Sequence, residues 1–120
     1  MEDFENLLRA VISPDNAARG QAEAALQGVL SQNPGMVLSC LGQTLRSSTD
    51  LVVRSTSAVL MRRYASDLFR NPKTGADEME LAKASLLGSI QEESDRSIRR
   101  KVADTTGALP SAMSVRAVYP

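Results

Sequence analysis

Few side chains in this sequence have the type and spacing that catalysis or metal binding requires. Histidine is absent, which removes the commonest general base and the usual imidazole ligand of metals. The single cysteine, Cys40, can form neither an internal disulfide nor a multi-thiolate zinc site, and its apolar neighbours predict a buried, inert thiol. The sequence shows no spacing typical of a nucleophile with its base and no phosphate-binding glycine loop. We therefore expect no catalysis, no metal and no cofactor.

The charged residues do not favour a nucleic acid or a membrane as partner. The 120 residues carry 14 basic and 14 acidic side chains, so the net charge is zero. A basic cluster at 96–101 is typical of a localisation signal or a nucleic-acid patch, but acidic residues at 92, 93 and 95 weaken both interpretations. The acidic start MEDFENLL and the absence of a long apolar run predict neither a signal peptide nor a membrane span. We therefore expect a soluble intracellular protein.

One charged pattern, an aspartate followed four residues later by an arginine, occurs three times. The pairs are Asp15 with Arg19, Asp50 with Arg54, and Asp95 with Arg99. An aspartate in this position caps the start of a helix, and an arginine four residues later can pair with it along the helix surface. We interpret these residues as structural, with each arginine tied to its own aspartate.

Apolar residues at helical spacing predict six helices and no strand. The expected helices span about 2–12, 13–32, 36–45, 50–65, 78–92 and 94–109, with 67–77 as the longest loop and 111–120 as a poorly ordered tail. Ser13 is expected to cap the second helix, with Pro14 at its first position. The methionines at helical positions are expected to fill the core: Met36, Met61 and Met79. Single glycines inside the helices suggest close helix packing: Gly20, Gly28, Gly42 and Gly88.

The aspartate and arginine pattern opens every second helix, which indicates repeated helix pairs. Its three starts lie 35 and 45 residues apart, and a two-helix unit of about 40 to 47 residues is the HEAT period. We therefore predict an all-α fold, a right-handed α-solenoid of HEAT repeats of the armadillo-like kind with about three helix pairs. The expected repeats span about residues 1–33, 34–70 and 76–110.

Three segments carry a family resemblance: SPDNAARGQAEAAL at 13–26, QNPGMVLSCLGQTL at 32–45 and VRSTSAVLMRRYAS at 53–66. They resemble the first two HEAT repeats of the importin-β (karyopherin-β) nuclear transport receptors, and are most similar to the importin beta-3 type. In that group the first repeat commonly reads D-N-x-x-R-x-x-A-E-x-x-L and the second V-R-x-x-A-A-V-L-L-R-R. The sequence departs from the second pattern at Ser57 and Met61. With a similar third repeat, the resemblance covers about residues 1–109.

The resemblance implies that the second helix of each pair lines a concave surface that binds the GTP-bound form of the small GTPase Ran. It places Met61, Arg62, Arg63 and Tyr64 in that contact, since neighbouring guanidinium groups give forked, charge-assisted hydrogen bonds to acidic or carbonyl groups. It also implies a role in protein import into the nucleus, with residence in the cytoplasm and the nucleus. Arg62 and Arg63 equally suit a solvated helix C-terminus without any partner, so both interpretations stay open.

Receptors of this family are long superhelices, so 120 residues match only an N-terminal part of one. Contacts with cargo proteins or nucleoporins are therefore expected only in a longer form. The alternative is a generic HEAT scaffold for some other protein, or an inert fragment. Without a following repeat, we expect an exposed apolar strip near Leu86, Leu87, Ile90 and Val102.

Overall fold

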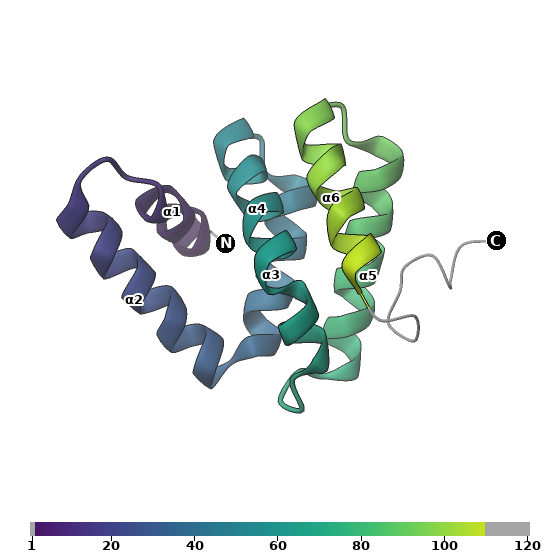
Figure 1. Ribbon diagram of the computed structural model, residues 1–120, viewed down its shortest axis with the longest axis horizontal. Helices are drawn as coiled ribbons and strands as arrows, with labels where there is room; N and C mark the ends of the chain where they lie inside the picture. Colours follow the sequence, from purple (N-terminus) through teal and green to yellow (C-terminus); the bar gives the residue numbers. More distant parts are fainter. Residues whose placement is uncertain (1, 110–120) are drawn as a thin grey trace.

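The computed structural model describes residues 2–109, which form six α-helices (Figure 1). These are α1 (Glu2–Val11), α2 (Asn16–Gln32), α3 (Pro34–Ser47), α4 (Leu51–Arg70), α5 (Ala76–Glu92) and α6 (Arg96–Ala108). No strand occurs among the described residues, and the predicted all-helical fold is confirmed. The tail predicted at 111–120 lies outside the described residues.

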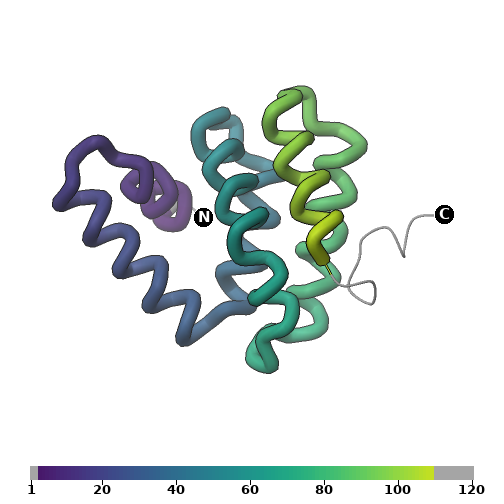
Figure 2. Tube along the Cα trace, in the orientation of Figure 1, coloured from purple at the N-terminus to yellow at the C-terminus, as the bar shows by residue number. Residues whose placement is uncertain are grey.

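The helices stack as three successive pairs. α3 packs against α5 and α4 packs against α6, so the first helices and the second helices of these pairs form two layers. α1 packs against α2 and also reaches α4, and the trace in Figure 2 shows this first pair at one end of the stack. The first pair joins the others through α1, which packs against α4, and through α2, which packs against α3.

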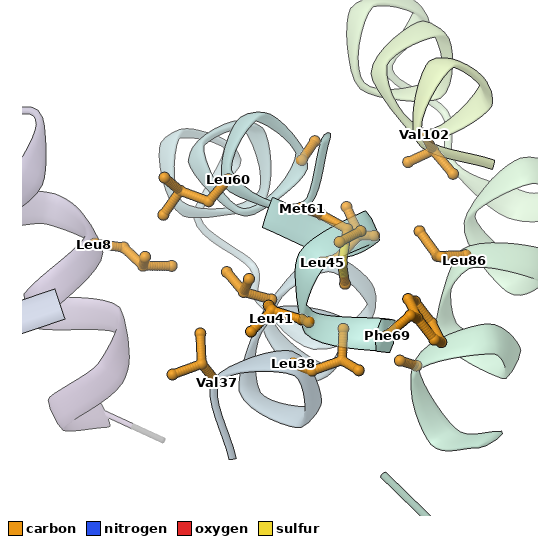
Figure 3. Close-up of a cluster of buried hydrophobic side chains, with 14 of the residues drawn as sticks. Leu8, Val37, Leu38, Leu41, Leu45, Leu60, Met61, Phe69, Leu86 and Val102 are labelled. Carbon is orange, nitrogen blue, oxygen red and sulfur yellow. The ribbon is translucent and has the colours of Figure 1, made fainter. Parts of the chain in front are cut away.

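One apolar core connects the three pairs. Its fully buried side chains come from five helices, at the spacings of three and four residues that place side chains on one helix face. Burying each such side chain is worth about 1.5–3 kcal/mol. The core includes Leu8 of α1, Leu38, Leu41 and Leu45 of α3, Met61 and Phe69 of α4, Leu86 of α5 and Val102 of α6 (Figure 3).

The apolar strip predicted at the end of the stack is wrong for two of its four residues. Leu86 is 0 % exposed and Val102 is 1 % exposed, because α5 packs on α3 and α6 packs on α4, which turns both side chains into the core. Leu87 is partly buried against that core. Ile90 is exposed, as predicted, and so is Leu81.

Each aspartate of the recurring pattern caps the second helix of its pair, as predicted. Ser13 is not the cap of α2, and Pro14 lies before the helix rather than in it. Ser13 Oγ instead accepts a hydrogen bond from the Asp15 amide at 3.2 Å, and the carboxylate of Asp15 serves the free amides of the helix. The aspartates accept from backbone amides at 2.9 to 3.1 Å: Asp15 from Ala17, Asp50 from Val52, and Asp95 from Ile98.

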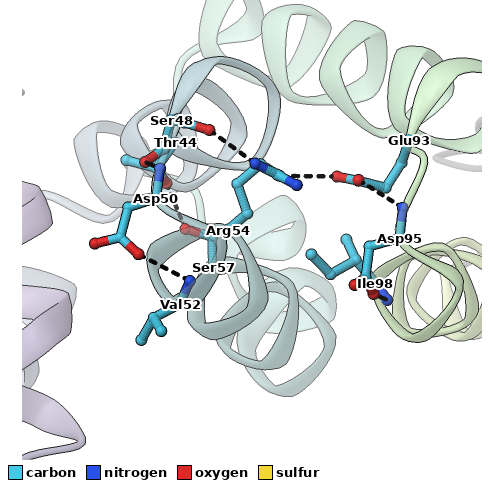
Figure 4. A network of polar contacts seen from close by, with 9 residues as sticks. All are labelled: Thr44, Ser48, Asp50, Val52, Arg54, Ser57, Glu93, Asp95 and Ile98. Carbon is cyan, nitrogen blue, oxygen red and sulfur yellow. Dashed lines mark hydrogen bonds and ion pairs between the residues drawn. The ribbon is translucent and has the colours of Figure 1, made fainter.

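The prediction that each arginine pairs with its own aspartate is wrong. Arg54 Nη1 donates to the carbonyl oxygen of Ser48 at 3.2 Å (Figure 4), and Arg19 Nη1 donates in the same way to the carbonyl oxygen of Ser13 at 3.2 Å. The aspartate side chains turn toward the helix amides, so the arginines reach back to the preceding loop. Within residues 2–109, the exposed side chain of Arg99 makes no hydrogen bond or ion pair.

Ion pairs between carboxylates and arginines join the successive helix pairs. Arg9 Nε of α1 donates to Asp50 Oδ2 at 3.0 Å, while the other oxygen of Asp50 caps α4. Arg54 Nε of α4 lies 3.3 Å from Glu93 Oε1, and Glu93 Oε2 accepts from the Asp95 amide at 3.0 Å (Figure 4). Each carboxylate therefore orders the turn before a second helix and ties that turn to the preceding pair.

A buried pair of hydroxyl groups joins α3 to α4. Thr44 Oγ1 and Ser57 Oγ lie 2.6 Å apart, and neither residue is exposed (Figure 4). A buried hydroxyl is costly unless it has a hydrogen-bonding partner. Ser57, one of the two departures from the family pattern, therefore finds its partner in Thr44.

Several helix limits differ from the predictions, most of all the end of α4, and one core assignment differs too. α4 continues to Arg70 rather than ending near 65, because Leu68 and Phe69 are buried in the core. α3 begins at Pro34 rather than at 36, because Asn33 Oδ1 accepts from the Met36 amide at 3.3 Å and proline suits the first turn. The side chain of Met36 is exposed, so its assignment to the core is wrong.

Close helix packing explains two of the four helical glycines. A Cβ at Gly42 would lie 2.9 Å from Ser85 Oγ, and a Cβ at Gly88 would lie 2.8 Å from Arg46 Nε. α3 and α5 therefore approach closely at these positions. At Gly20 and Gly28 of α2 a Cβ would meet nothing within 4 Å, so the prediction of close packing is wrong there.

Truncation of Leu86 should destabilise the fold strongly. Leu86→Ala removes a fully buried side chain and leaves a cavity, so we expect the free energy of unfolding to fall by about 2–5 kcal/mol. Leu81→Ala is the matched control on the same helix, because Leu81 is 57 % exposed and its loss should change that energy by less than about 0.5 kcal/mol. Urea unfolding followed by circular dichroism measures both. Equal losses would contradict the placement of α5.

The pair of Asp50 with Arg9 should make stability depend on pH. The Arg9 side chain hydrogen-bonds the carboxylate and holds the pKa of Asp50 below its usual value. A lowered pKa stabilises the fold above the unfolded pKa, and that stabilisation is lost as the pH falls through the folded pKa. Asp50→Asn keeps a capping oxygen but removes the charge, so it should destabilise the protein at pH 7 and progressively less below about pH 4.

Urea midpoints of both proteins between pH 7 and pH 3 test this expectation. Asp15→Asn is the control, because Asp15 caps α2 and forms no ion pair within the described residues. A difference between Asp50→Asn and the parent protein that stays constant down to pH 3 would show that the Arg9 contact contributes nothing.

Candidate protein-binding surface

The four residues placed at a binding surface by the sequence lie in the middle of α4 and divide between core and surface. Arg62 and Arg63 are exposed, Tyr64 is half-buried, and Met61 is fully buried. The inward positions of the helix are occupied by Leu60, Met61, Ala65 and Leu68, which turns the two arginines outward. Met61 therefore offers no atom to a partner and instead fixes this stretch of α4 in the core.

Arg63 and Tyr64 are held together and linked to α2. The guanidinium carbon of Arg63 lies 5.3 Å from the centre of the Tyr64 ring, a distance at which a cation is attracted to the aromatic face. The Tyr64 hydroxyl accepts a hydrogen bond from Gln27 Nε2 of α2 at 3.0 Å. The surface of α4 is thus joined to the second helix of the preceding pair.

A groove of about 390 Å³ lies between α2 and α4 beside these residues. The small residues Gly20 and Ala24 of α2 line it, and Glu23 of α2 and Arg63 of α4 give it one negative and one positive side chain. A groove with both charges suits a polar protein surface better than an apolar ligand. The other residues that line it are Val11, Leu26, Gln27, Leu60 and Tyr64.

Arg62 connects the same surface to α6. Its Nη1 lies 3.5 Å from Asp104 Oδ2, and both side chains are about half exposed. An exposed pair of this kind contributes little to stability, because solvent screens it and two long side chains must be ordered. Breaking the pair to let Arg62 contact a partner therefore costs little stability.

Sequence reasoning identified the residues of α4 but missed those contributed by the neighbouring helices. Gln27 and Asp104 are single polar residues on exposed helix faces and belong to no motif, whereas Glu23 belongs to the family pattern of the first repeat but was not assigned to the binding surface. The spacing of Gln27 four residues after Glu23 places both on one face of α2. That shared face is the signal that could have identified them.

A second groove, of about 290 Å³, lies between α1, α2 and α3 and is mostly apolar. Its lining includes Phe4, Leu7, Met36 and Cys40. Cys40 is half-buried rather than buried as predicted, and desolvation raises the pKa of its thiol, which keeps the sulfur protonated and weakly nucleophilic.

The described part of the chain contains neither a metal-binding cluster nor a membrane-spanning helix. Within residues 2–109, no three histidine, cysteine, aspartate or glutamate side chains are grouped so that they could hold a metal ion. None of the helices there has both the length and the apolar character that crossing a membrane requires.

In comparisons with known proteins, the fold of this chain is similar to part of a karyopherin. No family model matches the chain. The crystal structure of Kap121p bound to RanGTP matches with a TM-score of 0.78 and 28 % sequence identity over 92 % of this chain. A structure of a Kap121p mutant matches with a TM-score of 0.73 and 27 % identity over the same share. Kap121p is a karyopherin of the importin-β family.

These matches support the predicted architecture, an α-solenoid of HEAT repeats. The chain spans only 11 % of the length of the Kap121p chains that it matches.

Proposed function

We propose that this chain is an N-terminal part of an importin-β-type nuclear transport receptor, that it binds the GTP-bound form of Ran, and that it supports protein import into the nucleus. The observation that carries the proposal is the likeness in fold and sequence to Kap121p, whose structure was determined bound to RanGTP. Similarity to the importin beta-3 type, and residence in the cytoplasm and the nucleus, belong to the same proposal.

The contact with Ran is assigned to the exposed surface of α4. Arg62 and Arg63 can give charge-assisted hydrogen bonds to carboxylates or carbonyl groups of the GTPase, and Tyr64 supplies a ring with a polar tip. Met61 supports this surface from the core and does not touch the partner. The groove beside α2 gives the partner a recess to enter.

The proposed activity needs binding alone. It involves no catalytic residue, no metal and no cofactor, and its partner is a protein rather than a nucleic acid or a membrane. Contacts with cargo proteins and nucleoporins are assigned to a longer form, because this chain corresponds to about a tenth of the receptor that it resembles.

Titration of the chain with Ran tests the proposal. Ran loaded with a non-hydrolysable GTP analogue should bind, and Ran loaded with GDP should bind much more weakly or not at all. Replacing both Arg62 and Arg63 by alanine should lower the affinity at least about tenfold, since hydrogen bonds from charged groups are worth about 1.5–3 kcal/mol each. Isothermal titration calorimetry measures both effects.

The matched control replaces Lys73 and Lys83 by alanine. Lys73 lies in the loop after α4 and Lys83 lies on α5, the first helix of its pair, so the variant loses the same charge away from the proposed binding surface. Its affinity for the GTP form should change less than twofold. Equal binding of both nucleotide forms, or none, would leave a generic HEAT scaffold or an inert fragment.

A further inference from the structure

The link between Gln27, Tyr64 and Arg63 points to a residue that acts through another one. Gln27 Nε2 donates to the Tyr64 hydroxyl at 3.0 Å, and Arg63 lies over the ring of that tyrosine. In the part of the chain that the structure describes, this is the side-chain hydrogen bond that joins α2 to α4. The groove between the two helices lies beside it.

The hydrogen bond restricts the tyrosine, and the tyrosine restricts the arginine. A tyrosine side chain has two rotatable bonds, so a fixed hydroxyl together with a half-buried ring leaves little freedom. The arginine side chain is long and loses much conformational entropy when a partner orders it. A guanidinium that already rests on a fixed ring has less to lose on binding.

We propose that Gln27 is a positioning residue, which orders Arg63 for its contact with the partner by fixing the Tyr64 ring. This inference rests on the proposed function, because the partner used to test it is GTP-bound Ran. Gln27 also lines the groove, so the test must distinguish its action through Tyr64 from a direct contact with the partner. In the positioning role, the effect of Gln27 on affinity passes through the Tyr64 hydroxyl.

A double-mutant cycle distinguishes positioning from direct contact. Tyr64→Phe keeps the ring but removes the oxygen that Gln27 contacts. We expect Gln27→Ala and Tyr64→Phe each to weaken binding of Ran with a non-hydrolysable GTP analogue by about three- to tenfold, the effect of one hydrogen bond. The combined variant should bind no more weakly than either single variant.

Gln21→Ala is the matched control, because Gln21 is exposed on the same helix and does not line the groove. Its affinity should equal that of the parent chain. Losses that multiply in the combined variant, or an unchanged affinity of Gln27→Ala, would overturn the proposal.

A measurement on the free chain separates this inference from the proposed function. The Nε–H signal of Arg63 in the NMR spectrum, identified by its loss in Arg63→Lys, should be displaced by the ring current of Tyr64. Gln27→Ala should move it toward the position of an unordered arginine, and Gln21→Ala should leave it in place. A signal that does not respond to Gln27→Ala overturns the inference even if Ran does not bind.

Discussion

A carboxylate that serves two partners at once fixes how each later helix pair meets the pair before it. One oxygen of Asp50 caps α4 and the other receives Arg9, and Glu93 divides its oxygens in the same way between the Asp95 amide and Arg54. The start of each later second helix is thereby tied to the pair before it. The apolar faces of the six helices meet in one core, in which α3 packs against α5 and α4 packs against α6.

The sequence predicted those parts of this arrangement that involve residues close together in the chain. The aspartate caps follow from groups two or three residues apart, so the pattern alone identified them. The partner of Arg54 could not be identified in this way, because Glu93 lies 39 residues further along the chain. The predicted end of α4 was wrong for a related reason. Phe69 stays helical because it packs in the core, and core packing depends on helices distant in the sequence.

The candidate binding surface likewise combines residues that the sequence identifies with residues that only the fold brings together. Arg62 and Arg63 form a recognisable motif. The contact of Gln27 is apparent only in the fold, which brings its Nε2 within 3.0 Å of the Tyr64 hydroxyl. Met61 belongs to the same stretch of sequence yet lies entirely inside the core. A family pattern thus marks a stretch of helix, while the three-dimensional packing decides which of its residues a partner can reach.

A double-mutant cycle on Arg54 and Glu93 tests the role of the shared carboxylates most directly. Arg54→Ala, Glu93→Gln and the combined variant are compared by urea unfolding, with the exposed pair of Arg62 and Asp104 as the reference. The side chain of Glu93 is 6 % exposed, so its coupling to Arg54 should reach about 1 kcal/mol or more, against less than about 0.5 kcal/mol for the exposed pair. Coupling no larger than that of the reference pair would contradict the account, because the stack would then depend on apolar packing alone.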